Sequence, residues 1–197
     1  MREIALHLLD IAENSVAAEA KNITLTVCED LQGDRLTASV IDDGKGMTAE
    51  MAAKVTDPFT TSRTTRKVGL GIPLFKSAAE SCNGSLIINS EIGKGTRLNV
   101  EFQHSHIDRM PLGDLSATML TLFVAYPKIH WLFDYEVIPS NGMREEKFVF
   151  DSQPVMAELG DIPLTEPAVL GFIREYIESG VSRVWAASNN KTTIPQQ

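Results

Sequence analysis

The stretch from Leu36 to Val55 constrains the fold of this 197-residue chain more than any other segment. Apolar and polar residues alternate over residues 36–41, which predicts a strand that ends in two aspartates, the first of them Asp42. Gly44 and Gly46 follow, and glycines permit a tight turn and the close approach of a ligand. Thr48 then has the chemistry of an N-cap for a short helix through Val55. This order favours a ligand site, although an ordinary strand-to-helix turn has the same pattern.

The flanking segments supply further polar groups. Helical spacing of apolar residues from Arg2 to about Ala20 predicts a first helix, on which Asp10 and Asn14 lie one turn apart. These two side chains could hold a cation and a water, or they could form a solvated helix face. A basic, hydroxyl-rich loop then ends in Gly69-Leu70-Gly71, where another helix is predicted to begin. A helix start of this kind binds anions, and the alternative is a surface loop with spare charge.

Two nucleotide-binding motifs can be tested directly. The P-loop requires G-x-x-x-x-G-K-[ST], and Gly93-Lys94-Gly95-Thr96 lacks that spacing. Gly44-x-Gly46-x-x-Ala49 does fit the dinucleotide fingerprint that follows a strand. That fingerprint requires an acidic residue about 20 positions later, where this chain has the basic loop around Arg63 to Lys67. We therefore disfavour both motifs.

Five ordered motifs instead resemble those of the GHKL superfamily, the Bergerat-fold ATPases of DNA gyrase, the heat-shock chaperone, sensor histidine kinases and mismatch-repair ATPases. They match the family's N box, first glycine box, F box, second glycine box and final threonine. In chain order they are Asp10-Ile-Ala-Glu13-Asn14-Ser15, Asp42-Asp-Gly44-Lys-Gly46-Met47, Asp57-Pro-Phe59-Thr-Thr-Ser, Gly69-Leu70-Gly71 and Gly95-Thr96. The resemblance covers Arg2 to about Gln103. It implies a two-layer α/β sandwich, with a mixed, mostly antiparallel sheet and helices on one face.

The resemblance also implies that ATP binds together with Mg²⁺. Asp42 would accept the hydrogen bond of the adenine 6-amino group, and Thr96 would support Asp42 through a water. The adenine pocket would be lined by Gly44, Gly46 and Met47. Asn14 would ligate Mg²⁺ through its amide oxygen, which is a hard ligand suited to that ion.

The phosphate end of the implied site lies later in the chain. The backbone N–H groups of Gly69, Leu70 and Gly71 would cradle the phosphates. Either Arg66 or Lys67 would neutralise their charge, and Phe59 would anchor a short lid over residues 60–68.

The catalytic output is left open by the sequence. Asp10 occupies the position where the ATPases have a glutamate base and many kinases an asparagine, so it is a candidate base. Because the chain starts at the N-box helix, we expect a stand-alone protein without a phosphoacceptor-histidine domain, and we interpret His7 as structural. The output would be phosphoryl transfer to a partner protein, as by a histidine kinase or an anti-sigma-type serine kinase, or hydrolysis. The alternative is a nucleotide-gated interaction module without catalysis.

The remaining chain carries no motif of this family. We expect residues 104–185 to form an extension that packs on the ATP-binding domain of residues 1–103 and replaces its missing N-terminal elements. It would contain a helix capped by Asp114, an aromatic β-hairpin over residues 129–151 and a helix from Thr165 to Gly180. Residues 186–197 would be a mobile tail. His104 and His106 are too few ligands to indicate a metal site.

Composition restricts the partners and the compartment. A net charge of −8 and a pI near 5.0 argue against nucleic acid or an acidic membrane as partner. No apolar run reaches spanning length, the N-terminus does not resemble a signal peptide, and two cysteines do not make a disulfide scaffold. We therefore expect a cytoplasmic protein. The resemblance to histidine kinases implies a role in signal transduction, and the sequence leaves a homodimer open.

Overall fold

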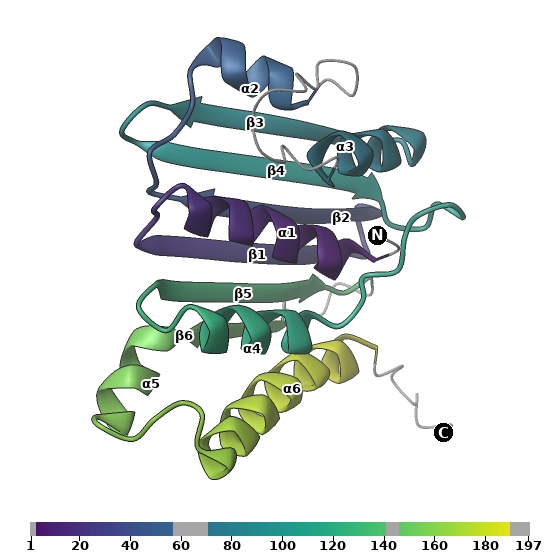
Figure 1. Cartoon of the computed structure of the whole chain (residues 1–197). Helices are drawn as coiled ribbons and strands as arrows, with labels where there is room; N and C mark the ends of the chain where they lie inside the picture. Colours follow the sequence, from purple (N-terminus) through teal and green to yellow (C-terminus); the bar gives the residue numbers. More distant parts are fainter. Residues whose placement is uncertain (1–2, 57–70, 141–145, 190–197) are drawn as a thin grey trace, which may run out of the picture.

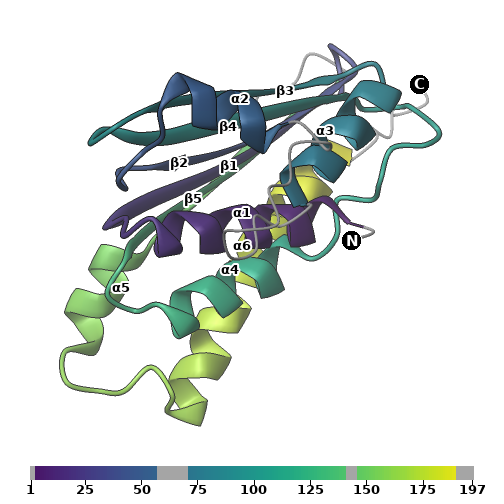
Figure 2. The ribbon, with the colours of Figure 1, turned by 45° about the horizontal axis from the view of Figure 1, so that its top comes forward.

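A computed structural model describes residues 3–56, 71–140 and 146–189. In this part of the chain, six strands form one sheet in the order β3-β4-β2-β1-β5-β6. The four longest helices, α1, α3, α4 and α6, cover one face of that sheet (Figure 1), and the tilted view separates the two layers (Figure 2). The elements are α1 (Ile4–Ala17), β1 (Asn22–Asp30), β2 (Arg35–Asp42), α2 (Ala49–Val55), α3 (Gly71–Ser81), β3 (Ser85–Glu91), β4 (Gly95–Gln103), α4 (Leu115–Ala125), β5 (His130–Ile138), β6 (Glu146–Asp151), α5 (Ser152–Leu159) and α6 (Pro167–Asn189). The predicted α/β sandwich, mixed and mostly antiparallel, is confirmed.

The strand register explains how the two halves of the chain join. β1 pairs with β2, β2 with β4, β3 with β4 and β5 with β6, all antiparallel. The β1–β5 pair is parallel, and it runs from the Asn22–His130 pair to the Asp30–Ile138 pair. A parallel pair needs a long crossover connection, and residues 31–129 provide it. The β5–β6 hairpin therefore extends the same sheet that carries Asp42.

The helix starts follow the local chemistry expected of them. The Thr48 hydroxyl accepts a hydrogen bond from the Met51 N–H at 3.2 Å and caps α2. The Asp114 carboxylate accepts one from the Ala117 N–H at 2.8 Å and caps α4. Both caps satisfy a backbone donor that has no partner within its own helix.

Two features of the C-terminal part differ from the sequence prediction. A short helix, α5, follows β6 directly, capped by the Asp151 side chain, and the sequence analysis does not predict it. The last helix does not stop at Gly180 but continues to Asn189, so residues 186–189 are helical. Gly180 is buried in that helix against the Phe148 ring. A β-carbon at this position would lie 2.3 Å from the ring, so only glycine fits without a shift. The glycine serves close packing, which its sequence pattern does not distinguish from a helix end.

The core lies between the sheet and its helices and is continuous along the whole sheet. Phe75 and Phe102 are fully buried under the N-terminal half, and Trp131, Phe133 and Phe150 are fully buried under the extension. Burial of aromatic side chains this large dominates the energetics of such a core. Within the described residues, no helix is both long enough and apolar enough to cross a bilayer.

Candidate functional site

A cavity of about 300 Å³ lies beside the strand end that carries Asp42. Apolar side chains from α1, α2, β2, β3 and β4 form most of its wall, and Ile72 in the first turn of α3 closes one side. The polar groups on the wall include Asn14, Ser15 and Thr96 together with the Asp42 carboxylate. A mainly apolar pocket with a few polar groups, at the small end of the usual range of ligand-pocket volumes, suits a flat aromatic ligand.

Three donors hold the Asp42 carboxylate in place. Its Oδ1 accepts hydrogen bonds from the Gly44 N–H at 2.9 Å and from the Thr96 N–H at 3.2 Å. Its Oδ2 accepts one from the hydroxyl of Ser15, a buried residue of α1, at 2.6 Å. A carboxylate oxygen can accept two hydrogen bonds, so Oδ2 retains an acceptor position for a donor in the cavity.

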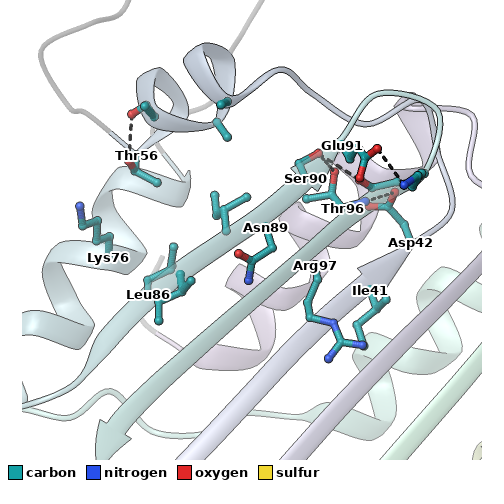
Figure 3. A pocket seen from close by; sticks show the side chains of 17 residues that line it. Ile41, Asp42, Thr56, Lys76, Leu86, Asn89, Ser90, Glu91, Thr96 and Arg97 are labelled. Carbon is teal, nitrogen blue, oxygen red and sulfur yellow. Dashed lines mark hydrogen bonds and ion pairs between the residues drawn. The ribbon is translucent and has the colours of Figure 1, made fainter.

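Hydrogen bonds of the Ser90 hydroxyl link the turn after Asp42 to the β3–β4 pair. The Met47 N–H donates to the Ser90 hydroxyl oxygen at 2.8 Å, and that oxygen lies 2.9 Å from the Thr96 hydroxyl. Figure 3 shows Asp42, Ser90 and Thr96 gathered at this end of the strands. Gly46 fits here because its φ is +64° and a β-carbon would lie 2.0 Å from the Glu91 carbonyl oxygen.

Asp43 has a different environment from its neighbour. Its carboxylate accepts hydrogen bonds from the Lys21 N–H at 2.7 Å and the Asn22 N–H at 2.9 Å, and from the Asn22 side-chain amide at 2.6 Å. Desolvation would raise the pKa of Asp43, but these hydrogen bonds outweigh it and hold the pKa below its ordinary value. Asp43 therefore stays ionised and fixes the turn to the start of β1.

The polar residues of α1 are distributed along one side of the helix. Asn14 is exposed and borders the cavity, whereas Asp10, one turn earlier, is half-buried and does not line it. His7, one turn further back, is 3% exposed and stacks on Phe75 with 4.4 Å between ring centroids. Burial lowers the pKa of His7, against the opposing influences of Asp10 and the Gly71 backbone. A neutral, stacked ring of this kind is a core element.

The phosphate end of the predicted site is described only in part. Gly71 is the first residue of α3, and the adjacent Ile72 lines the same cavity as Asp42. The start of this helix, where backbone N–H groups lack helical partners, thus borders the cavity. The other predicted residues of this end lie outside the described residues: Phe59, Arg66, Lys67, Gly69 and Leu70.

A second, larger depression of about 770 Å³ runs along the edge strand β3 (Figure 3). Its wall includes the exposed charged side chains of Glu91, Lys94 and Arg97. It meets the first cavity at Asp42 and Thr96. The smaller cavity is the better candidate for a nucleotide base, because its wall is more apolar and α1 borders it.

No group of three or more His, Cys, Asp or Glu residues that could hold a metal occurs in the described ranges. His104 is instead paired with Glu29 at 2.8 Å, and His106 accepts a hydrogen bond from the Asp108 N–H. Asn14, on the cavity wall, has an amide oxygen of the hard type that Mg²⁺ prefers.

Two serines have roles that no sequence motif indicated: Ser15, on the wall of the cavity, and Ser90, on the wall of the neighbouring depression. Ser15 holds Asp42 Oδ2, and Ser90 joins the turn to β3 and β4. Helical spacing places Ser15 on the buried side with Ile11, which is a signal available from the sequence. Ser90 carries no comparable signal, because its partners come together only when β3 and β4 pair.

A strand-end carboxylate, a glycine turn and the start of a helix thus border one cavity. Residues 1–106 match the family model described as "Histidine kinase-, DNA gyrase B-, and HSP90-like ATPase". The chain belongs to this family, whose domains bind nucleotide.

The curated relatives include bacterial proteins that are named as kinases. The chain is 27% identical over 109 residues to a putative sensor histidine kinase NtrY-like of Rickettsia conorii, which covers 55% of this chain and 18% of that protein. It is 30% identical over 94 residues to sporulation kinase E of Bacillus subtilis, covering 47% of this chain and 12% of the kinase. The chain thus spans less than a fifth of the length of these two relatives.

One solved structure resembles most of the chain. The N-terminal domain of a DNA repair protein has a TM-score of 0.50 and 12% identity, covering 76% of this chain and 52% of that one. At this level of identity the likeness concerns the fold alone.

Proposed function

We propose that this protein binds Mg-ATP in the cavity beside Asp42. The observation that carries the proposal is the hydrogen bonding of that carboxylate, which is fully used at Oδ1 and has a position left at Oδ2. The 6-amino group of adenine would donate to Oδ2. Guanine has a carbonyl oxygen at the same position, which would face the carboxylate without a proton between them, so the site would discriminate against GTP.

The remaining contacts of ATP are assigned from the family motifs, and among them Gly46, Met47, Asn14 and Thr96 line the cavity. Gly44, Gly46 and Met47 would surround the base, with Thr96 holding Asp42. The start of α3 at Gly71 would face the phosphates, with Gly69, Leu70, Arg66 and Lys67 preceding it and Phe59 anchoring the lid. Mg²⁺ would be held by phosphate oxygens, waters and the Asn14 amide oxygen, since Mg²⁺ keeps several waters and few protein ligands. When bound, the ion would neutralise phosphate charge.

Calorimetry with Asp42→Asn tests the binding proposal. The substituted amide would use its oxygen for the Gly44 and Thr96 N–H groups and present its NH₂ group to the base. We expect Mg-ATP affinity to fall by about ten- to a hundredfold, as for the loss of a hydrogen bond to a charged group, while the preference for ATP over GTP narrows.

Asp161→Asn, an exposed change of the same type between α5 and α6, is the matched control and should bind ATP like the unsubstituted protein. Equal affinity of the unsubstituted protein for ATP and GTP would contradict the role given to Asp42.

For the catalytic output we propose that the protein acts in the cytoplasm and transfers the γ-phosphoryl group of ATP to a partner protein or to water. The kinase relatives support this proposal, and Asp10 is the candidate base that would polarise an attacking hydroxyl or water. The position of Asp10 outside the cavity wall favours a second candidate, a nucleotide-gated interaction module without catalysis. Incubation with γ-labelled ATP and cell extract separates them: a labelled protein indicates a kinase, phosphate release lost in Asp10→Asn indicates hydrolysis, and neither indicates the module.

A further inference from the structure

Four chain segments meet at the sheet edge next to the cavity: the end of β2, the starts of β1 and β5, and the β6–α5 junction (Figure 1). Each contributes one polar side chain to a continuous row. Asn22 Nδ2 lies 2.6 Å from Asp43 Oδ2, and Asn22 Oδ1 lies 3.1 Å from His130 Nδ1. His130 Nε2 lies 2.9 Å from Asp151 Oδ1. The row joins the turn that carries Asp42 to the cap of α5.

The chemistry of the two ends fixes where the protons lie in this row. The ionised Asp43 carboxylate only accepts, so the Asn22 NH₂ group must face it and the Asn22 amide oxygen must face His130. The Asp151 carboxylate at the other end also accepts, since it takes the Gln153 N–H as the α5 cap. Both ring nitrogens of His130 therefore face acceptors. The row is completely hydrogen-bonded only when His130 is an imidazolium, because a neutral ring has one N–H group.

We propose that protonated His130 links the extension to the nucleotide site, with Asn22 and Asp43 as positioning residues for Asp42. This inference rests on the proposed binding of ATP in that cavity. Asp43 adjoins Asp42 and pins the turn to β1 through three hydrogen bonds. With His130 protonated, Asn22 is held on both sides and the turn keeps the Asp42 carboxylate aimed into the cavity. With His130 neutral, one junction of the row is lost and ATP binds more weakly.

The surroundings of His130 agree with a cation at this place. Asp151 faces the ring directly from the β6–α5 junction, and Asp43 faces it through Asn22 from the β2 side. On the β1 side, the carbonyl oxygen of Lys21 accepts a hydrogen bond from the backbone N–H of His130 at 2.9 Å. Lys128, before β5, is exposed. Because the His130 and Asp151 side chains are 26% and 39% exposed, solvent screens the pair and the effect on binding should be modest.

The test is the affinity for Mg-ATP at about pH 6 and about pH 8.5, on either side of the range in which histidines change charge. The unsubstituted protein is compared with His130→Gln and with the matched control His106→Gln, whose ring lies in the β4–α4 connection. Differences between variants cancel the titration of ATP itself. We expect His130→Gln to bind about threefold to tenfold more weakly at the lower pH, and the gap to close at the higher pH. His106→Gln should follow the unsubstituted protein at both.

A measurement without nucleotide or substitution completes the test. Nitrogen-15 NMR of the His130 ring should show both nitrogens protonated at about pH 6, within the range where the imidazolium is accessible. A neutral ring there, or a His130→Gln profile identical to that of the unsubstituted protein, would overturn the inference. Absence of ATP binding by the unsubstituted protein would instead refute the proposed function, and the NMR result would still decide the proton positions in the row.

Discussion

At the scale of single residues, the two adjacent aspartates show how position decides chemistry. Asp42 ends β2 and points into the cavity, where it keeps an acceptor position. The Asp43 side chain lies at the start of β1, where its carboxylate oxygens accept hydrogen bonds from Lys21 and Asn22. The sequence shows only two neighbouring carboxylates. Their separate roles follow from the pleat and the turn, which send consecutive side chains to opposite sides.

His7 gives a residue-scale prediction about pH. Burial lowers its pKa in the folded protein below the ordinary value of 6.5, which the unfolded chain retains. The folded protein therefore binds fewer protons near that pH, so stability is full above it and is lost as the pH falls below it. His7→Phe keeps the stack on Phe75 and removes the titration. Urea unfolding between about pH 8 and about pH 5.5 should show a smaller loss of stability in this variant, the difference being at most about 1.4 kcal/mol per pH unit.

The control for this prediction is His106→Gln, which changes a ring in the connection between β4 and α4. It should lose stability toward acid in parallel with the unsubstituted protein. Parallel curves for His7→Phe as well would mean that the buried ring does not contribute to the pH dependence.

At the scale of elements, α6 shows the limit of local helix signals. Gly180 resembles a helix stop in the sequence, but in the structure it lies mid-helix, where its missing side chain admits the Phe148 ring of β6. Gly171 lies in the same helix, and apart from its chain neighbours and the nearby backbone of that helix, a β-carbon added there would meet no atom of the described residues within 4 Å. The two glycines therefore separate packing from intrinsic helix propensity.

Alanine at each glycine should have opposite effects on stability. Gly171→Ala should raise the free energy of unfolding by about 0.5–1 kcal/mol, because alanine is the better helix former. Gly180→Ala should lower it by about 1–3 kcal/mol, because the added methyl forces the Phe148 ring or the helix to move. Thermal or urea unfolding of both variants measures this. Stabilisation by Gly180→Ala would show that the contact with Phe148 relaxes without cost.

At the scale of the whole molecule, the extension and the family domain share one sheet and one core. β5 pairs with β1 over nine residue pairs, from Asn22–His130 to Asp30–Ile138. At the same border, the buried Glu29 of β1 accepts a hydrogen bond from the buried Tyr135 hydroxyl at 2.7 Å and pairs with the partly exposed His104 at 2.8 Å. Separation of the extension would therefore break these hydrogen bonds together with the β1–β5 ladder.

The two tryptophans, Trp131 and Trp185, both lie beyond residue 103, so their fluorescence reports on the extension. Far-UV circular dichroism reports on both parts. We expect urea transitions by the two probes to coincide, as for one cooperative unit, and saturating Mg-ATP to raise both midpoints together. A fluorescence transition that precedes the loss of circular dichroism would instead show that the extension unfolds separately.

Local patterns determined much of this protein. Period-two alternation predicted the strand that ends at Asp42, N-cap chemistry predicted the starts of α2 and α4, and five motifs in order indicated the family, because each signal acts over a few residues. Only the tertiary structure decided what depends on distant pairing: the parallel join of β5 to β1, the passage of α6 through Gly180, and the contacts of Ser90 and His130. Those partners are brought together by sheet assembly, which no short stretch of sequence encodes.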